Sequence, residues 1–558
     1  FYGLGSDGTV SANKNSIKII GDSTPLYAQG YFVYDSKKSG SITISHLRFG
    51  KTPIKSHYEI EDADFIACHN ERFIGKYDIL HKLKPNGTFL LNCEWENAEL
   101  ESKLPAEFKK EIFEKNINFY TINAVKIAKE LNLHGKINTI MQSAFFYLTK
   151  IIKFNEAKTQ MKKMAEKSYM KAGKEVVENN FKAIDQAPQN LVKINVPIGW
   201  KNSTSQVSTS LTHETSNFNE TIIKPISKQL GNTLPVGAFC ADGRVPTNTT
   251  QYEKRGIATA IPCWKSEHCI QCNMCSFVCP HGAIKPVLID KKTKKPTTFT
   301  TIKANMADKY EFRIQVSPLD CTGCGSCVNI CPAREKALVM ANADEQIEKQ
   351  KDNYQFAANL ENNTSIFGTS TVKGSQFAPC YFQFSGACAG CGETPYIKLA
   401  TQLFGENMVI ANATGCSSIY GGSYPTCPFT QNKKGFGPAW ANSLFEDNAE
   451  FGFGIKLANN SQTKCILQLI EKAKENKCKN AKLLDAWANS LDSYTKNNIF
   501  VEEILKKLPK EAEKAKQPLK SVLEEILSMK EFLTQKSVWI IGGLTMLLQA
   551  MKMLIFWF

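Results

Sequence analysis

Along the first third of the chain, the spacing of hydrophobic and polar positions alternates between the pattern typical of strands and the pattern typical of helices. Runs rich in β-branched and aromatic residues, bounded by turn residues, predict strands at Ser16–Ile20, Gly30–Tyr34, Ser41–Leu47, Phe65–Ala67 and Thr88–Leu91. Amphipathic repeats predict helices over Ala124–Leu131 and Met161–Lys182. Because strands that alternate with helices are typical of α/β proteins, residues 1–187 are predicted to form an α/β domain with a mostly parallel sheet.

The remaining patterns divide the chain further. Pro, Ser, Thr and Asn predict an irregular connecting segment over residues 188–235. A cysteine-rich module follows at 236–350, and a second α/β domain is predicted at 351–543. Within that domain, charged helical patterns such as Cys465–Lys472 and Val501–Lys507 indicate solvated helix faces. Residues 544–558 form a separate apolar tail.

Composition narrows the class of protein. A chain of 558 residues with 42% hydrophobic and 22% charged residues can bury several cores, which excludes a largely disordered protein. The net charge is +15, but only six of the 68 basic residues are Arg. Because Arg is the residue suited to bidentate reading of phosphates and bases, we predict no nucleic-acid partner. Lysine-rich solvated helices explain the charge, with a basic docking face for an acidic electron carrier as the alternative.

Two cysteine runs carry the strongest chemical signal. Each has the spacing C-x2-C-x2-C-x3-C-P, which is typical of bacterial two-cluster ferredoxins, where the fourth cysteine ligates the other run's cluster. We therefore predict one 4Fe-4S cluster on Cys269, Cys272, Cys275 and Cys331, and a second on Cys321, Cys324, Cys327 and Cys279. Zinc is the alternative, but one zinc ion needs only four ligands, and this repeat spacing has no zinc rationale.

Other residues of the module receive minor predictions. Cys263 lies outside the repeat and is predicted to be a packed thiol. His268 and His281 flank cluster cysteines and are candidates to tune the potential by hydrogen bonds to sulfur. Two adjacent clusters would conduct electrons, which requires a soluble acceptor at one end and a low-potential donor at the other.

A third cysteine group follows the module. Cys388 and Cys391 form a CxxC pair, which alone indicates a redox dithiol, a zinc half-site or a cluster half-site. Beside eight cluster cysteines, we interpret Cys388, Cys391 and Cys416 as three ligands of a third 4Fe-4S cluster. The surrounding segments, CAGCGETPY from Cys388, ATGCSSIYGG from Ala413 and GPAWANSLFEDNAE from Gly437, resemble the thiamine-diphosphate domain of pyruvate:ferredoxin (flavodoxin) oxidoreductases.

The beginning of the chain resembles the same family. The segments Gly3–Val10, Gln29–Gly40, Ser45–Gly50 and Ile137–Gln142 are similar to its third, gamma-type domain. The resemblance implies the order gamma-type α/β domain, small connecting domain, ferredoxin-like α+β domain and thiamine-binding α/β domain. It also implies oxidative decarboxylation of pyruvate with coenzyme A, which gives acetyl-CoA, carbon dioxide and electrons for ferredoxin or flavodoxin.

The family also implies cofactors and site residues. Thiamine diphosphate with Mg²⁺ would stabilise the carbanion left after decarboxylation, and Glu393 and Ser417 would lie near it. Gly3, Gly5 and Gly8 could form a phosphate-binding turn for coenzyme A; a tight turn that needs glycine is the alternative. A cytoplasmic homodimer is expected for the intact enzyme.

Three departures from the family pattern are present. The chain starts at Phe1 without the family's two preceding domains, so we expect a fragment. After Val538–Gly543, Leu544 stands where the resemblance implies the Mg²⁺-binding Gly-Asp-Gly, and the fourth ligand of the third cluster is missing; Cys427, Cys465 and Cys478 are candidates only by elimination. Read together with the preceding strand, the tail Leu544–Phe558 gives about twenty mostly apolar residues, the length of a membrane helix. A deletion with a shifted reading frame fits better, and we predict no membrane contact.

Two functions therefore remain open for these 558 residues: part of a pyruvate oxidoreductase, or an iron–sulfur electron-transfer module without activity of its own. A membrane-anchored redox protein is a distant third, supported only by the tail. His69 and His134 are assigned no role, and Cys68 and Cys93 are predicted to be buried thiols.

Overall fold

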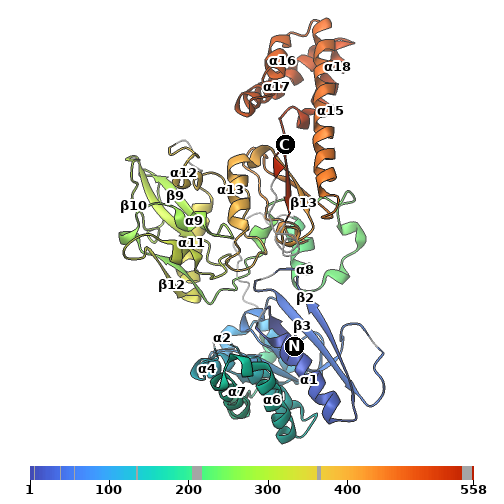
Figure 1. The fold of residues 1–558 in the computed structure, drawn as a ribbon, viewed down its shortest axis with the longest axis vertical. Coiled ribbons are helices and arrows are strands. Elements are labelled where there is room, and N and C mark those ends of the chain that lie inside the picture. The colour runs from blue at the N-terminus through green and yellow to red at the C-terminus, as the bar shows by residue number, and fades with distance from the viewer. Residues whose placement is uncertain are drawn as a thin grey trace. The chain divides into compact units, whose positions relative to one another are not determined.

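The computed structural model describes residues 1–5, 7–37, 39–55, 57–133, 136–203, 217–360, 366–542 and 556–557. The chain divides into two compact units, Phe1–Arg244 and Val245–Phe558, and each is described by itself (Figure 1). Several positions discussed above lie outside the described residues: Ser6, His134, Gly543 and the tail residues 544–555 and 558.

A seven-stranded sheet of order β2-β3-β1-β4-β5-β6-β7 forms the centre of the first unit. Its strands are β1 (Tyr2–Leu4), β2 (Tyr27–Tyr34), β3 (Ile42–Gly50), β4 (Ala63–Cys68), β5 (Leu83–Asn92), β6 (Asn118–Ile122) and β7 (Val192–Lys193). β1, β4, β5 and β6 are mutually parallel, whereas β2, β3 and β7 pair in antiparallel fashion. The prediction of a mostly parallel sheet was therefore wrong. A short connection joins β2 to β3, and such a connection permits only an antiparallel hairpin.

Both faces of this sheet are buried. In β5, Phe89 and Leu91 belong to one hydrophobic core and Leu90 to another, as the alternation of strand side chains requires. The described helices of the unit are α1 (Thr9–Ser23), α2 (Leu100–Lys103), α3 (Ala106–Glu114), α4 (Ala124–Glu130), α5 (Asn138–Thr149), α6 (Phe154–Tyr169), α7 (Lys174–Gln186) and α8 (Lys224–Ser227).

Two predicted elements of this unit differ from the structure. Ser16–Ile20 is part of helix α1 rather than a strand, because Ile19 and Ile20 pack with Phe145 and Phe146 in a helical core. Met161–Lys182 is divided into α6 and α7 at Gly173, whose φ of 115° cannot continue a helix. The other predicted strands lie within β2, β3, β4 and β5, and the Ala124–Leu131 helix coincides with α4.

The second unit begins with two small sheets around the cysteine runs. In the first sheet, β8 (Ala260–Trp264) pairs with β12 (Leu338–Asn342). In the second sheet, β11 (Tyr310–Val316) pairs with both β9 (Ile284–Asp290) and β10 (Ile302–Lys303). The short helices α9 (Met274–Phe277) and α10 (Ser326–Ile330) carry cysteines of the two runs. This α+β arrangement agrees with the predicted ferredoxin-like domain.

The rest of the second unit is α/β. β13 (Met408–Ala413) is parallel to β14 (Ala439–Ser443) and β15 (Ser537–Gly542), and β16 (Phe556–Trp557) pairs antiparallel with β15. The helices are α11 (Ala343–Ala358), α12 (Val372–Ser375), α13 (Thr394–Phe404), α14 (Cys416–Gly422), α15 (Asn448–Glu475), α16 (Ala481–Ala488), α17 (Tyr494–Lys514) and α18 (Leu519–Ser528).

The last four helices share a hydrophobic core of their own around the fully buried Trp487, and Figure 1 shows them grouped together in orange to red. The predicted helical patterns at Cys465–Lys472 and Val501–Lys507 lie within α15 and α17. Across the described part of the chain, every helix is too short or too polar to cross a lipid bilayer.

Candidate metal centres

The two strand pairs bring the two cysteine runs together. β8 precedes the first run and pairs with β12, which follows the second run; β9 follows the first run and pairs with β11, which precedes the second. In register, Trp264 lies opposite Leu338, and Ile284 lies opposite Val316. Each run therefore begins beside the end of the other, so the fourth cysteine of one run is delivered to the first three of the other.

Two separate small cavities result, each lined by four cysteines. One is lined by Cys269, Cys272, Cys275 and Cys331, together with Trp264, Ile314 and Leu338. The other is lined by Cys279, Cys321, Cys324 and Cys327, together with Pro262, His281 and Ile284. These are the two ligand sets predicted with crossed ligation, so the geometry supports that assignment.

The backbone winds around each cavity in the same way. Gln271 and Asn273 in the first run, and Gly323 and Gly325 in the second, adopt positive φ values between 60° and 76°. This winding turns backbone N–H groups toward sulfur, and the N–H of Gly323 lies 3.4 Å from Sγ of Cys321. Hydrogen bonds to cluster sulfurs are one way in which a protein sets a cluster's potential.

Burial opposes the ionisation of several of these thiols. Burial raises the pKa of Cys321 to about 12, and the adjacent thiolates of Cys279 and Cys324 act in the same direction. Burial and neighbouring thiolates also raise the pKa of Cys269, Cys275 and Cys327. Since cluster ligands are thiolates, these closely grouped cysteines suit a site in which iron supplies compensating positive charge.

The spacing of these thiols bears on the size of the bound group. A tetrahedral zinc site has Zn–S bonds of about 2.3 Å and draws its ligands onto a single point. Among the described residues, no three His, Cys, Asp or Glu side chains converge in the way that one metal ion requires. The assignment of 4Fe-4S clusters to these cavities therefore rests on the repeat spacing of the eight cysteines.

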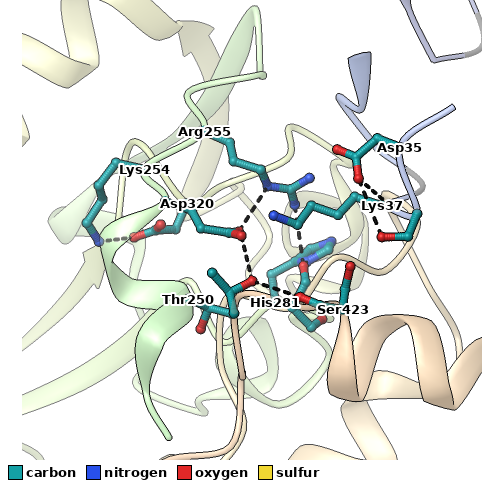
Figure 2. Close-up of polar contacts among 12 residues, drawn as sticks. Asp35, Lys37, Thr250, Lys254, Arg255, His281, Asp320 and Ser423 are labelled. Carbon is teal, nitrogen blue, oxygen red and sulfur yellow. Dashed lines mark hydrogen bonds and ion pairs between the residues drawn. The ribbon is translucent and has the colours of Figure 1, made fainter. Parts of the chain in front are cut away.

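A partly buried ion pair lies at the start of the second run. Asp320, which precedes Cys321, contacts Nζ of Lys254 at 2.5 Å (Figure 2). It also accepts a hydrogen bond from Ser317 at 2.6 Å. Lys254 also lies over the rings of Phe384 and Tyr354, 4.8 Å and 5.0 Å from their centroids. Burial raises the pKa of Asp320, whereas Lys254 opposes that change. Sequence reasoning missed this pair, because no motif links Lys254 to a carboxylate 66 residues away.

The two histidines of the module differ in environment. His281 is buried, lines the cavity of Cys279, and has Nδ1 3.1 Å from the carbonyl oxygen of Ser385; burial lowers its pKa to about 4. Nε2 of His268 lies 3.2 Å from a carboxylate oxygen of Glu335. Their proposed bonds to sulfur stay predictions. Cys263, half-buried in β8, fits a packed thiol.

The third cysteine group is more open. Cys391 and Cys416 pack against one hydrophobic core at the carboxyl end of β13, whereas Cys388 is exposed. The Cβ position of Gly390, between the pair, lies 3.8 Å from Cβ of Cys324, so this loop contacts the second cysteine run directly. The segment is therefore adjacent to the cavity of Cys279, Cys321, Cys324 and Cys327. A third cluster here stays a prediction.

The candidates for its fourth ligand occupy different places. Cys465 is exposed on α15, and Cys478 is buried in the core of the α15–α18 helices. Cys427 packs against the same core as Cys391 and Cys416, and burial raises its pKa to about 11. All nineteen cysteines of the chain are free thiols in the structure.

Glu393 and Ser417 lie near the carboxyl end of β13, the edge where parallel sheets bind ligands. Glu393 is the residue before α13 and accepts a hydrogen bond from the Tyr420 hydroxyl at 2.9 Å. Ser417 is buried in the first turn of α14. Burial and the Glu393 carboxylate raise the pKa of Tyr420. Tyr420 stands in the ATGCSSIYGG segment, but the sequence offered no reason to select it.

In the glycine-rich turn after β1, the backbone N–H groups are bound by the side chain of Asp7, which belongs to the turn itself. The Asp7 carboxylate accepts the N–H groups of Leu4 at 2.8 Å and Thr9 at 2.7 Å, and Gly5 donates to Ser41. A Cβ on Gly3 would lie 2.6 Å from Thr9. These contacts favour the tight-turn alternative over a phosphate site for Gly3, Gly5 and Gly8.

The residues predicted to be structural are buried. Cys68 and Cys93 are buried, and burial raises the pKa of each to about 12. Nδ1 of His69 lies 2.7 Å from Oγ1 of Thr9, within the core of the first unit.

Comparison with known sequences agrees with this arrangement. The profile of the pyruvate ferredoxin/flavodoxin oxidoreductase family matches residues 1–189, a domain of unknown function matches 204–258, and a 4Fe-4S dicluster domain matches 268–335. The last match covers both cysteine runs.

Curated proteins that match most of this chain have related names. The chain is 50% identical over 97% of its length to pyruvate:ferredoxin oxidoreductase of Moorella thermoacetica and covers 47% of that protein. It is 46% identical over 97% of its length to pyruvate-flavodoxin oxidoreductase of Klebsiella pneumoniae, covering 46% of it. Pyruvate dehydrogenase [NADP(+)] of Cryptosporidium parvum is 47% identical over 82% of the chain, which covers 25% of that protein.

The chain thus spans about half the length of the two bacterial relatives. Its cysteine runs, its domain matches and this degree of identity show that the chain is similar to these pyruvate:ferredoxin and pyruvate-flavodoxin oxidoreductases over nearly half of their length.

Proposed function

We propose that this chain takes part in the oxidative decarboxylation of pyruvate with coenzyme A, and that it carries the released electrons through 4Fe-4S clusters to ferredoxin or flavodoxin. Pyruvate and coenzyme A give acetyl-CoA, carbon dioxide, a proton and two electrons. The observation that supports this most strongly is the division of eight cysteines into two four-cysteine cavities.

The route of the electrons follows from contacts within the second unit. The Cys388–Cys391 loop contacts the run that contains Cys324 through Gly390. Electrons that arrive at this loop would pass to the cluster of Cys279, Cys321, Cys324 and Cys327, and then to the cluster of Cys269, Cys272, Cys275 and Cys331. The two predicted clusters would be close, because helix α9, which carries Cys275, contacts helix α10, which carries Cys327.

Fewer contacts support the thiamine site than the two cluster sites. Glu393, Ser417 and Tyr420 gather at the carboxyl end of β13, where the residues would contact the cofactor. Thiamine diphosphate, when bound, supplies the electron sink for the carbanion. The chain's own contribution would be the Glu393 carboxylate, oriented by the Tyr420 hydroxyl at 2.9 Å. Mg²⁺ binding and a homodimer stay predictions.

Electron transfer alone is the second candidate function. It is favoured by the sequence after β15, where Leu544 follows Gly543 in place of the Gly-Asp-Gly that the resemblance implied. Anaerobic reconstitution with iron and sulfide distinguishes the two candidates. Bleaching of the cluster absorbance by pyruvate, thiamine diphosphate, Mg²⁺ and coenzyme A supports the oxidoreductase; bleaching by dithionite only supports the electron carrier. A chain that binds no iron contradicts both.

A further inference from the structure

Lys398 connects the third cysteine group with the first cysteine run. It lies in α13, the helix that begins three residues after Cys391, and only 2% of its surface is exposed. Its ammonium donates hydrogen bonds to the carbonyl oxygens of Ser276 and Cys279, the latter at 3.3 Å. The Lys398 side chain therefore contacts the backbone of Cys279, a predicted cluster ligand 119 residues earlier.

Both acceptors of Lys398 are neutral carbonyl groups. The strongest charges that act on its pKa are those of cysteine thiolates and of Lys285. Burial lowers the pKa of Lys398, whereas the thiolates of Cys279, Cys380 and Cys275 raise it. A buried ammonium without an anionic partner is costly. The cysteines whose charges act on it most are Cys279 and Cys275, which are predicted cluster ligands, and Cys380, which is not.

The second run provides an internal comparison. Nζ of Lys336 donates to the carbonyl oxygen of Cys331 at 2.6 Å, so the fourth cysteine of each run has a lysine on its carbonyl group. Lys336 is exposed, however, and Lys398 is buried. Water and salt screen a surface charge far more than a buried one. The contact of a lysine with the cysteine carbonyl therefore has a much stronger electrostatic effect at Cys279 than at Cys331.

We propose that Lys398 is a positioning residue whose buried positive charge makes the cluster on Cys279, Cys321, Cys324 and Cys327 easier to reduce. The inference rests on the proposed function for the presence of that cluster. One-electron reduction adds a negative charge to a cluster that is already anionic through its four thiolates. A fixed cation stabilises the reduced form more than the oxidised form, and hydrogen bonds and local charge are established determinants of cluster potential.

The test is a redox titration followed by electron paramagnetic resonance, on the full chain reconstituted anaerobically. Three variants are compared: K398Q, which keeps a donor without charge, K398R, which keeps the charge, and K336Q as the matched exposed control. We expect K398Q to shift the reduction equilibrium of one cluster about tenfold toward the oxidised form, which corresponds to ~59 mV for one electron. K398R should shift it less than threefold, and K336Q should shift the equilibrium of the cluster that includes Cys331 less than threefold. K398M, neutral and of similar length, replaces K398Q if that variant does not bind iron.

The outcomes separate this inference from the proposed function. Potentials unchanged in K398Q and K398M would overturn the role of Lys398 while leaving the clusters in place. A shift as large in K398R as in K398Q would also overturn it, because position rather than charge would then be responsible. If the unaltered chain held no iron–sulfur cluster, the proposed function would fail first, and this inference with it.

Discussion

At the scale of single residues, the two cysteine runs reach one geometry with different side chains. Gln271 and Asn273 in the first run hold the same left-handed conformation as Gly323 and Gly325 in the second. Gln271 and Asn273 are buried, and their side chains bond to the main chain of Lys303 and Lys373. The left-handed conformation follows from the path of the backbone around each cavity. The first run adopts it with side chains that bond to the main chain, and the second run adopts it with glycine.

Gly323 and Gly325 allow a matched test of this winding. Both have positive φ, so alanine at either position should cost about 1–2 kcal/mol from the left-handed backbone alone. At Gly323 the added Cβ would also lie 2.8 Å from the carbonyl oxygen of Ala260, whereas nothing lies within 4 Å at Gly325. We expect G323A to lose iron from the second cavity and G325A to keep it, as measured by iron content. Equal iron loss in the two variants would contradict the steric argument.

The residues that the sequence could predict are those with a local signature. The cysteines follow a repeat whose spacing is typical of a crossed grouping, so the two ligand sets could be predicted from the sequence, and they line the two cavities. Lys398, Lys254 and Tyr420 have no such signature, because each makes its contact through the tertiary fold. Lys398 meets an acceptor 119 residues away, and only the packing of α13 on the first run brings them together.

At the scale of elements, local propensity was reliable where tertiary packing agreed with it. Gly30–Tyr34 and Ser41–Leu47 are β-rich and were predicted as strands; they belong to β2 and β3, which pair in antiparallel fashion. Ser16–Ile20 is equally β-rich but lies on the buried side of α1, where Ile19 and Ile20 fill a core shared with α5 and α6. The hydrophobic effect of that burial outweighs a weak strand preference.

The central strands of the first unit hold two histidines that should remain neutral. His46 in β3 accepts the N–H of Ile60 on Nδ1 at 3.1 Å, and burial lowers its pKa to about 3. Burial lowers the pKa of His69, which follows β4, to about 4. Both folded values lie below the ordinary value of 6.5. The stability they contribute is therefore complete above pH 6.5 and is lost as pH falls toward these values.

We expect the free energy of unfolding to fall between pH 6.5 and 5, with a slope of at most about 1.4 kcal/mol per pH unit for each histidine. Urea unfolding of the full chain measures this. The variants H46Q and H69Q control for carboxylates that titrate in the same range, and each should flatten the pH dependence. Profiles parallel to that of the unaltered chain would show that these histidines do not titrate on unfolding.

At the scale of the whole molecule, the division between the two units falls at Arg244 and Val245. The Arg244 side chain is 86% exposed, and the preceding Gly243 has open space around its Cβ position. We expect brief trypsin treatment to cleave after Arg244 and to leave the iron with the C-terminal fragment. Iron in the N-terminal fragment, or earlier cleavage inside the cysteine-rich module, would argue against this division.

The most direct test of the account concerns which cysteines share a cluster. Crossed ligation assigns Cys279 to the group of Cys324 and separates it from the group of Cys272. The double variant C279S/C324S should therefore keep one 4Fe-4S cluster, whereas C279S/C272S should keep none, as measured by iron content and electron paramagnetic resonance after reduction. The reverse pattern, with one cluster kept in C279S/C272S and none in C279S/C324S, would contradict the crossed arrangement and the electron path built on it.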